Sequence, residues 1–516
     1  MRLTLRLITL AGIATLTAPL SLAAVAARAG AAAGTQSAAR AQSEAGAQAA
    51  AGAQSAASTP RAASTPRAAS ARPAASTPSE WPQFGHSPRH LNTNPAEKTF
   101  TRSNVKRLRT IFTADFGSNT ATEGGPAVAN GVLYQAGFDG NLNAYPASGC
   151  GQPSCQPLWR GMATGDFTST PAVSGGLVFI ASADHFLYAF PAAGCGAAVC
   201  APRWKAHLRD GVVDSSVSVA GGVAYVGDFS GHLYAFTAAG CGEPVCQPLW
   251  TGHGLKTELI GAPAAGNGFV YVTTFNSTPN LVNGRLLVFP AAGCGQASCT
   301  PSWTAGIGGP AGSTAAPAVT RNTVYTTSGT LFGNGVNTNF HLRAFPAAGC
   351  GAKTCKPLRT YDTGDGGAEG APAVSGTTVF ATTQASPDPN SLGVVAAYPA
   401  AGCGKPQCEP LWTGINFESG FASPPSVVNG VVFVGKGPAT TVPVDAGVFA
   451  FSTAGCGAPT CMPIKFVQLS ANQDYLGAPL AVAEGKVFMA SDDNVSGRSL
   501  VYAIGLPAAG RRAGSR

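Results

Sequence analysis

Residues 191–204 read Pro-Ala-Ala-Gly-Cys-Gly-Ala-Ala-Val-Cys-Ala-Pro-Arg-Trp, and the central part of this stretch occurs seven times in the chain. Each copy contains Gly-Cys-Gly, three variable residues, a second Cys, one variable residue and Pro. Successive copies begin 45, 46, 53, 56, 53 and 53 residues apart. A period of this length is typical of one four-stranded propeller blade, so the repeat decides the fold class.

The repeats use all 14 cysteines of the chain, two in each copy. We interpret the two cysteines of each copy as a structural disulfide, because the short loop holds their Cα atoms within bridging range. Zinc would need four ligands and no His has a useful spacing, while the Cys-x-x-Cys spacing of redox proteins is absent. The expected pairs are Cys150–Cys155, Cys195–Cys200, Cys241–Cys246, Cys294–Cys299, Cys350–Cys355, Cys403–Cys408 and Cys456–Cys461.

Each repeat also contains four short stretches with β propensity, separated by turn residues. In residues 170–204 they are 171–173, 177–180, 186–190 and a last one that carries Trp204, and the cysteine loop precedes the last. Small-residue strands open eight times, near Pro126, Pro171, Val217, Pro263, Pro317, Pro372, Pro425 and Leu480, although there are only seven cysteine loops. The eighth repeat lacks its fourth strand, which Leu108–Ala114 can supply from the N-terminal side. We therefore predict an all-β, eight-bladed propeller of four-stranded antiparallel blades, with the last blade completed by an N-terminal strand.

The sequence predicts four segments: a signal peptide over 1–29, a disordered Ala/Ser/Pro-rich spacer over 30–79, the propeller over 80–507 and a basic disordered tail over 508–516. Arg2 and Arg6 precede an apolar run, and small residues near Ala26 provide a cleavage site. The same run is long enough to span a bilayer if it is retained as an anchor. We expect a secreted or cell-envelope protein, outside the cytoplasm, with no membrane span after cleavage.

The charge of +8 is unevenly distributed. Residues 1–79 carry +6, the tail carries +3, and residues 80–507 carry only −1. A nearly neutral propeller has no basic footprint for nucleic acid, so we expect no nucleic-acid partner. We expect the ring to be a monomer.

Two features indicate where a ligand could bind. The connections between second and third strands are long in five consecutive repeats, at 275–284, 328–339, 383–392, 436–446 and 492–498. They should form one recognition face for a protein or glycan, or they are insertions tolerated at exposed turns. Glu123, Asp214 and Glu369 occupy one repeat position before inner strands. They could hold a calcium ion or a cationic ligand at the channel mouth, or they could be solvated loop residues. The seven histidines show no constellation and are expected to be exposed.

Several blades resemble the pyrroloquinoline-quinone (PQQ) type repeat of bacterial quinoprotein dehydrogenases and their non-catalytic exported relatives. The resemblance rests on residues 225–236, followed by Gly240 and Trp250, and on a lead-in with Trp81, Gly85 and Asn94. It implies an eight-bladed propeller over about residues 80–507. Tryptophan, which docks neighbouring blades in this family, is replaced by Arg359 and Lys465 in two repeats.

The chain lacks the adjacent cysteine pair of alcohol-oxidising quinoproteins and a Cys-x-x-Cys-His haem site. We therefore expect a binding or scaffold module for a protein, glycan or cell-envelope component, without catalysis, and no bound cofactor. The alternative is a quinoprotein oxidoreductase that acts on alcohols or sugars with PQQ and calcium.

Overall fold

The structure is a computed structural model, and it describes residues 79–507 apart from 119–123, 212–214, 254–257, 277–283, 309–315, 329–340, 364–369, 384–393, 416–422, 437–445, 470–472, 475–477 and 494–496. The chain divides into two units, residues 1–73 and 74–516, and all described residues lie in the second. The predicted signal peptide, the spacer up to residue 78 and the tail lie outside the described residues.

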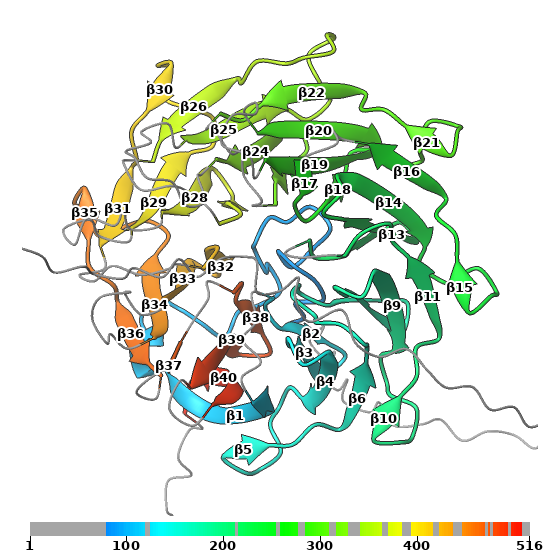
Figure 1. The fold of residues 1–516 in the computed structure, drawn as a ribbon. Helices are drawn as coiled ribbons and strands as arrows, with labels where there is room; N and C mark the ends of the chain where they lie inside the picture. The colour runs from blue at the N-terminus through cyan, green and yellow to red at the C-terminus, as the bar shows by residue number, and fades with distance from the viewer. Residues whose placement is uncertain are drawn as a thin grey trace, which may run out of the picture. The chain divides into compact units, whose positions relative to one another are not determined.

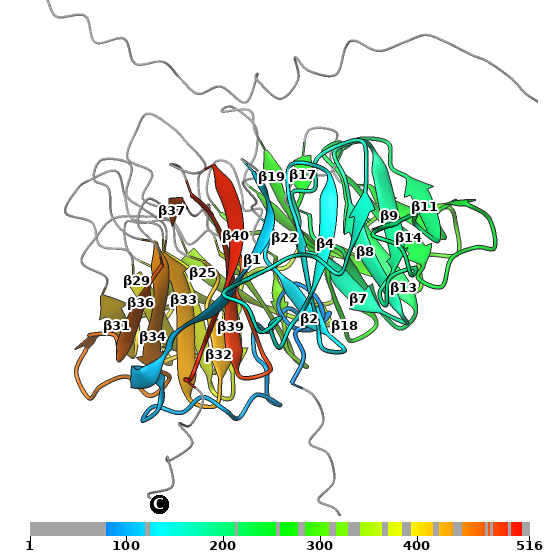
Figure 2. The ribbon, with the colours of Figure 1, turned by 90° about the horizontal axis from the view of Figure 1, so that it is seen from below.

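The described residues form a ring of eight β-sheets around a central axis, as predicted (Figures 1 and 2). Each sheet is one blade, and its strands run in order from the axis to the rim.

Blade 1 consists of β2 (Ala127–Ala129), β3 (Val132–Ala136), β4 (Asn141–Pro146) and β6 (Trp159–Met162). Blade 2 consists of β7 (Ala172–Ser174), β8 (Leu177–Ala181), β9 (Phe186–Pro191) and β11 (Trp204–His207), and blade 3 of β12 (Ser218–Ala220), β13 (Val223–Gly227), β14 (His232–Thr237) and β16 (Trp250–His253). Blade 4 consists of β18 (Ala264–Gly266), β19 (Phe269–Asn276), β20 (Arg285–Pro290) and β22 (Trp303–Gly306), with β17 (Glu258–Ile260) beside β19.

Blade 5 consists of β23 (Ala318–Val319), β24 (Thr323–Thr327), β25 (His341–Pro346) and β26 (Arg359–Asp362). Blade 6 consists of β27 (Ala373–Ser375), β28 (Thr378–Thr383), β29 (Val394–Pro399) and β31 (Trp412–Ile415), and blade 7 of β32 (Ser426–Val428), β33 (Val431–Lys436), β34 (Gly447–Ser452) and β36 (Lys465–Gln468). Blade 8 consists of β38 (Ala481–Ala483), β39 (Lys486–Asp493), β40 (Arg498–Gly505) and β1 (Arg109–Ser118), with β37 (Gln473–Asp474) beside β39.

The ring closes between the two ends of the propeller sequence. Strand β1 pairs antiparallel with β40, from Arg109 opposite Gly505 to Ser118 opposite Arg498. The 3-10 helix η2 (Val105–Arg107) leads into β1. The prediction that an N-terminal strand completes the last blade is confirmed, and the strand extends four residues beyond the predicted Ala114.

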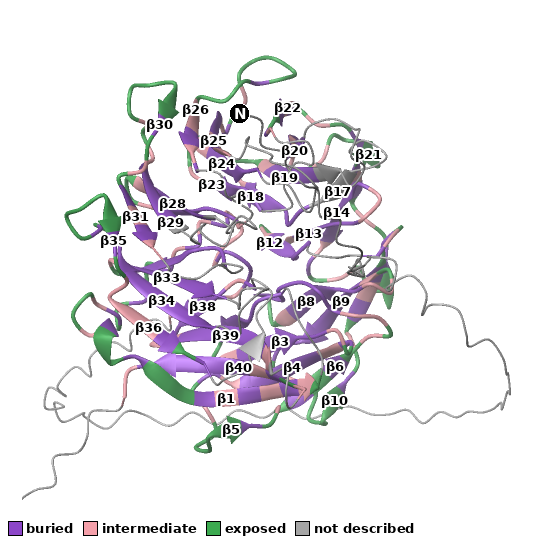
Figure 3. Cartoon of the chain, turned by 60° about the vertical axis from the view of Figure 1, so that its left-hand side comes forward, coloured by how far each residue is buried: buried purple, intermediate pink, exposed green. Residues whose placement is uncertain are grey.

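Hydrophobic cores form between neighbouring blades. Phe179 and Trp204 of blade 2, for example, belong to one buried cluster with Val217 and Tyr234 of blade 3. Because each blade packs its faces against two neighbours, its strands are buried on both sides. Figure 3 shows this pattern, with buried strands in the ring and exposed loops at the rim.

All seven predicted disulfides are present, each between the third and fourth strands of a repeat, with Cα–Cα distances of 5.6–5.7 Å. We call each loop from Gly-Cys-Gly to the second Cys a clasp. A clasp also contains a short strand that pairs in parallel with the outer strand of the preceding blade. These short strands are β5 (Ser154–Cys155), β10 (Val199–Cys200), β15 (Val245–Cys246), β21 (Ser298–Cys299), β30 (Gln407–Cys408) and β35 (Thr460–Cys461).

The prediction of four strands per blade was therefore incomplete, because a clasp adds a fifth strand that comes from the next repeat. At blade 4 the same contact is a single bridge between Thr304 and Thr354. Sequence periodicity could not reveal this pairing, because the two-residue strands are too short to show a pattern.

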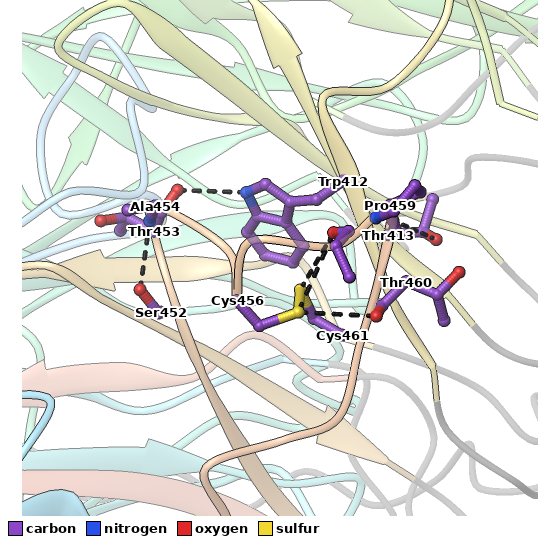
Figure 4. The surroundings of a disulfide bond; sticks show 10 residues. Trp412, Thr413, Ser452, Thr453, Ala454, Cys456, Pro459, Thr460 and Cys461 are labelled. Atoms are coloured by element: carbon purple, nitrogen blue, oxygen red, sulfur yellow. Dashed lines mark hydrogen bonds between the residues drawn. A yellow bond between two sulfur atoms is a disulfide. The ribbon is translucent and has the colours of Figure 1, made fainter.

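The clasp also explains the recurrent Trp and Gly. The Trp412 indole Nε1 donates a hydrogen bond to the Thr453 carbonyl at 3.2 Å, beside the Cys456–Cys461 disulfide (Figure 4). The first Gly of that clasp, Gly455, has φ +70°, and a Cβ there would lie 2.7 Å from Cδ1 of Trp412. Trp and Gly therefore form one interlocking contact between neighbouring blades.

Candidate functional site

We define residues 79–108 as the lead-in; its first part occupies the axis of the ring, and its last part leads to the outer strand β1 (Figure 1, blue). Its first part contacts the innermost strand of every blade in turn. Trp81 exchanges two hydrogen bonds of 2.8 Å with Val128 of blade 1, and the series ends where Asn94 Nδ2 donates to the Val482 carbonyl of blade 8 at 2.9 Å. The acceptors for the backbone N–H groups between them are the Pro82 carbonyl for Val173, Gln83 Oε1 for Val219, the Pro88 carbonyl for Ala265, and the Arg89, Leu91 and Asn92 carbonyls for Val319, Val374 and Val427.

These contacts have a simple physical cause. The innermost strand of a blade is a sheet edge, and its outward N–H groups have no strand partner. A buried N–H without a partner is unfavourable by about 1–3 kcal/mol, so the lead-in satisfies groups that the repeats leave open. The sequence indicates the lead-in only as the segment that opens the propeller. Its role at the axis is not predictable in this way, because this non-repeating stretch carries no strand pattern.

The lead-in follows the axis with sharp turns. Gly85, His86, His90 and Asn92 have φ of +64°, +72°, +51° and +51°. Phe84 belongs to a buried cluster with alanines that precede three inner strands, Ala262, Ala316 and Ala371. The lead-in therefore fills the centre of the ring with side chains as well as backbone.

His90 is an unusual group at this place. Its side chain is completely buried, its ring lies edge-on to Phe84 at 5.0 Å, and neither ring nitrogen has a hydrogen-bond partner in the described part of the chain. Burial lowers the pKa of His90 to about 3 and that of His86 to about 4. Both imidazoles are therefore neutral at physiological pH.

A second polar cluster lies where the strands of blade 3 end. Asp228 follows β13 and accepts backbone hydrogen bonds from Ser230 at 3.0 Å and His232 at 2.8 Å. The Tyr234 hydroxyl donates to Asp228 Oδ2 at 2.8 Å, and His232 Nδ1 lies 3.2 Å from Asp228 Oδ1. This carboxylate caps the tight turn between β13 and β14 and fixes the imidazole of His232.

His232 is also paired across the sheet. It lies opposite His253 of β16, with ring centroids 5.0 Å apart. Burial, and then the charge of His232, lowers the pKa of His253, while burial raises the pKa of Tyr234. The pair offers two imidazoles and an orienting carboxylate to a polar ligand, next to the exposed surface.

The sequence had suggested neither the pairing of these histidines nor the burial of His232, whose exposed fraction is 8%. The two residues are 21 positions apart, but they lie at the start of a third strand and the end of a fourth, which pair antiparallel. The position of each histidine within its repeat, at the start of a third strand and at the end of a fourth, was the sequence signal from which this pairing could have been predicted. The expectation that the histidines are exposed was wrong for His232 and for His90, which is fully buried.

The three candidate metal residues, Glu123, Asp214 and Glu369, all lie outside the described residues. The long connections of blades 4 to 8 also fall mostly outside them, although the strands on either side are described. Within the described ranges, no group of three or more His, Cys, Asp or Glu side chains is placed to hold a metal ion. Nor does any helix in those ranges have the length and hydropathy to span a membrane.

Comparison with known proteins agrees with the fold. A family model described as outer membrane protein assembly factor BamB matches residues 95–338. The search of curated proteins found no match.

Among solved structures, quinohemoprotein alcohol dehydrogenase from Comamonas testosteroni is similar with a TM-score of 0.57 and 14% identity, covering 84% of this chain and 81% of that one. BamB from Moraxella catarrhalis is similar with a TM-score of 0.51 and 15% identity, covering 78% and 98%. The computationally designed protein Ika8 is similar with a TM-score of 0.53 and 11% identity, covering 77% and 99%. At these identities the likeness concerns the fold alone, and a fold does not by itself decide the function. With its eight blades and its repeat signature, this chain is an eight-bladed β-propeller whose repeats are similar to the PQQ-like type over residues 95–338.

Proposed function

We propose that this chain is an extracytoplasmic, non-catalytic binding module that holds a protein, glycan or cell-envelope component on the face formed by the long connections. The observation that carries the proposal is the position of the described strands on either side of these connections. In five consecutive blades the second strand ends and the third strand begins at the same end of the sheet; these strand pairs are β19 and β20, β24 and β25, β28 and β29, β33 and β34, and β39 and β40.

The blades that carry such a surface are held together both at the axis and at the rim of the ring. The lead-in hydrogen-bonds to the inner strand of each blade, and clasps join neighbouring blades at the rim. Long connections on a rigid scaffold form binding surfaces without disturbing the core. The seven disulfides support a location in an oxidising compartment, and the similarity to BamB supports a role in protein binding.

The test compares the full chain with a variant in which residues 437–445 and 384–393 are each replaced by a tight turn like Asp228–Gly231 of blade 3. Both proteins are immobilised and incubated with cell-envelope extract. We expect the native chain to retain partners that the short-turn variant loses. The matched control, Leu411→Ser at an exposed rim position, should retain them. Equal retention by all three proteins would contradict the proposal.

A second arm addresses the quinoprotein alternative. PQQ and calcium are added to the purified chain, and cofactor absorption and dye-linked oxidation of alcohols and sugars are measured. Turnover under these conditions would replace the binding proposal with an oxidoreductase.

A further inference from the structure

The outer strands of the blades are not all covered alike. In six blades one backbone N–H of the outer strand donates to a clasp carbonyl at 2.8–2.9 Å, and it belongs to the second residue of that strand in every case except blade 8. These donors are Thr113, Arg160, Lys205, Thr251, Thr304 and Thr413. In blade 5, β26 pairs with the clasp strand β30. Seven of the eight outer strands therefore have a clasp on their edge.

Blade 7 is the exception. Among the described residues its sheet ends at β36, and no clasp strand pairs with β36. The N–H of Ile464 donates to the Ala450 carbonyl, as the N–H of Leu411 donates to the Ala397 carbonyl in blade 6, so Phe466 occupies the position of Thr413. The N–H of Phe466 has no acceptor among the described residues. The cause is the closure of the ring: the eighth repeat has no cysteine loop, so no clasp reaches back to blade 7.

The side chains of this edge fit an incoming strand. Lys465 stands where Trp412 stands in blade 6, and its ammonium group has no hydrogen bond or ion pair in the described part of the chain. Phe466 is half-buried, and its ring stacks on Phe449 with centroids 4.4 Å apart. An added strand would thus meet a free backbone donor, an aromatic surface and a cation.

The neighbouring lead-in adds positive charge. Residues 98–109 contain no acidic side chain and five exposed basic ones, Lys98, Arg102, Lys106, Arg107 and Arg109. Arg109 lies opposite Gly505, at the end of the third strand of blade 8, where an eighth clasp would begin. Val105 and Leu108 share a buried cluster with Val467 of β36.

We propose that the open edge of β36 binds an extended acidic segment of a partner protein, which adds to blade 7 as its fifth strand. Strand addition uses the same parallel pairing that the clasps use at other blades, and main-chain hydrogen bonds provide its affinity. The basic residues belong to the segment 98–109, which reaches blade 7 where Asn429 Nδ2 donates to the Lys98 and Phe100 carbonyls, and their charge favours an acidic strand. The tail of this chain carries Arg511, Arg512 and Arg516, the same sign of charge as the edge, so it fits this position poorly.

The first test is hydrogen exchange of the full chain without a partner. The amide of Phe466 should exchange at least ten-fold faster than that of Thr413, whose clasp is intact. Equal protection of the two amides would overturn the proposal. If the Phe466 amide were protected in the full chain but not in a chain ending at Pro507, the tail of this chain would be the segment bound at the edge of β36. Protection that increases with protein concentration, together with a doubled mass in solution, would identify a second copy and would also overturn it.

The second test uses a defined probe. The probe is a disulfide-closed peptide with the sequence of residues 452–462, made with Ala458→Glu and Thr460→Glu, and the unchanged peptide is the neutral control. We expect fluorescence anisotropy to show at least ten-fold tighter binding of the acidic probe, and 0.5 M NaCl to remove most of this difference. Equal binding of the two probes, or no binding of either, would overturn the proposal.

Two variants of the full chain separate backbone from charge. Phe466→Pro removes the free N–H at an edge position and should weaken probe binding at least ten-fold. Phe466→Thr keeps this N–H and removes only the aromatic ring, so it should weaken binding less, by about three-fold. Lys106→Glu combined with Arg107→Glu should weaken only the acidic probe. Equal binding by the Pro and Thr variants would show that the probe does not add as a strand.

Discussion

The rim and the axis of this propeller are held together in opposite ways. At the rim, a contact between two neighbouring blades is repeated by seven clasps, each with its own disulfide. At the axis, one segment that occurs once, residues 81–94, contacts all eight inner strands. The repeated clasps join each blade to its neighbour, whereas the single segment 81–94 joins all eight blades at the axis. Damage at the rim should therefore be local, and damage at the axis should affect every blade.

The largest effect should follow removal of the axial segment. A chain that starts at Pro95 loses the contacts to the inner strands, and each lost hydrogen bond is worth about 1 kcal/mol before the exposed N–H groups are counted. We expect the free energy of unfolding to fall by more than roughly 5 kcal/mol, or the ring to fail to close. Chemical unfolding followed by circular dichroism measures this change.

The control for this truncation is a chain that starts at Ser79, which keeps the whole lead-in, including the hydrogen bonds of Ser79 with Asn94, Glu97 and Glu484. It should unfold at the same denaturant concentration as the full chain. If the chain starting at Pro95 also matched it, the axial contacts would be without energetic importance.

The second effect is acid sensitivity at the axis. The pKa of buried His90, about 3, lies below its unfolded value of 6.5, so the unfolded state binds more protons between these pH values. Stability is therefore complete above pH 6.5 and falls as the pH is lowered, by about 1.4 kcal/mol per pH unit for this histidine. Asn accepts the positive φ of this position, so His90→Asn should flatten the pH dependence between 6.5 and 4.

His86 titrates in the same direction and remains in that variant, so the slope should decrease without vanishing. The measurement is the free energy of unfolding at several pH values, and the slope, not the absolute stability, is compared. An unchanged slope in the His90→Asn protein would show that His90 takes up no additional proton on unfolding.

The same contrast explains what the sequence could predict. The repeat revealed the eight blades, the disulfides and the closing strand, because Cys150 to Cys461 and the eight strand openings recur at a fixed spacing. The axial contacts of Gln83 and Asn92, and the pairing of His232 with His253, were not predictable in this way. They depend on residues from different repeats, or from no repeat, that meet only when the ring has closed. The clasp strands were missed for a related reason, since each pairs with a blade other than its own.

At the rim, the third effect is the loss of one clasp disulfide. Replacing Cys456 and Cys461 with Ser should lower the free energy of unfolding by about 2 kcal/mol, because the closed loop is short and restricts the unfolded chain only modestly. The loss should be local. Hydrogen exchange should increase in β35 and β31, which this clasp joins, and should not change in β6 or β11 on other blades. Faster exchange throughout the ring would show that one clasp affects distant blades.

The smallest effect concerns two glycines of the same clasp. Gly455 and Gly457 have φ of +70° and +85°, so Ala at either position brings similar backbone strain, about 1–2 kcal/mol. They differ in what a Cβ would meet: at Gly455 it lies 2.7 Å from Cδ1 of Trp412, whereas at Gly457 no atom lies within 4 Å. Gly455→Ala should therefore be less stable than Gly457→Ala by about 1 kcal/mol, the smaller end of the range for overpacking.

A third glycine sharpens this comparison, because Gly402 has the same place in its clasp but faces Arg359 instead of Trp. An added Cβ would lie 2.4 Å from Cδ and 2.5 Å from Nε of that arginine. Arg359 also donates a hydrogen bond, from Nη1 to the Ala400 carbonyl at 3.3 Å, but its unbranched side chain can move its Cδ and Nε by rotation. The Trp412 indole is a rigid ring, held by its hydrogen bond to Thr453 and by its packing on Phe451. Gly402→Ala should thus resemble Gly457→Ala more than Gly455→Ala in thermal unfolding. If Gly402→Ala were as destabilising as Gly455→Ala, the rigidity of the indole would not be what makes glycine necessary at this position.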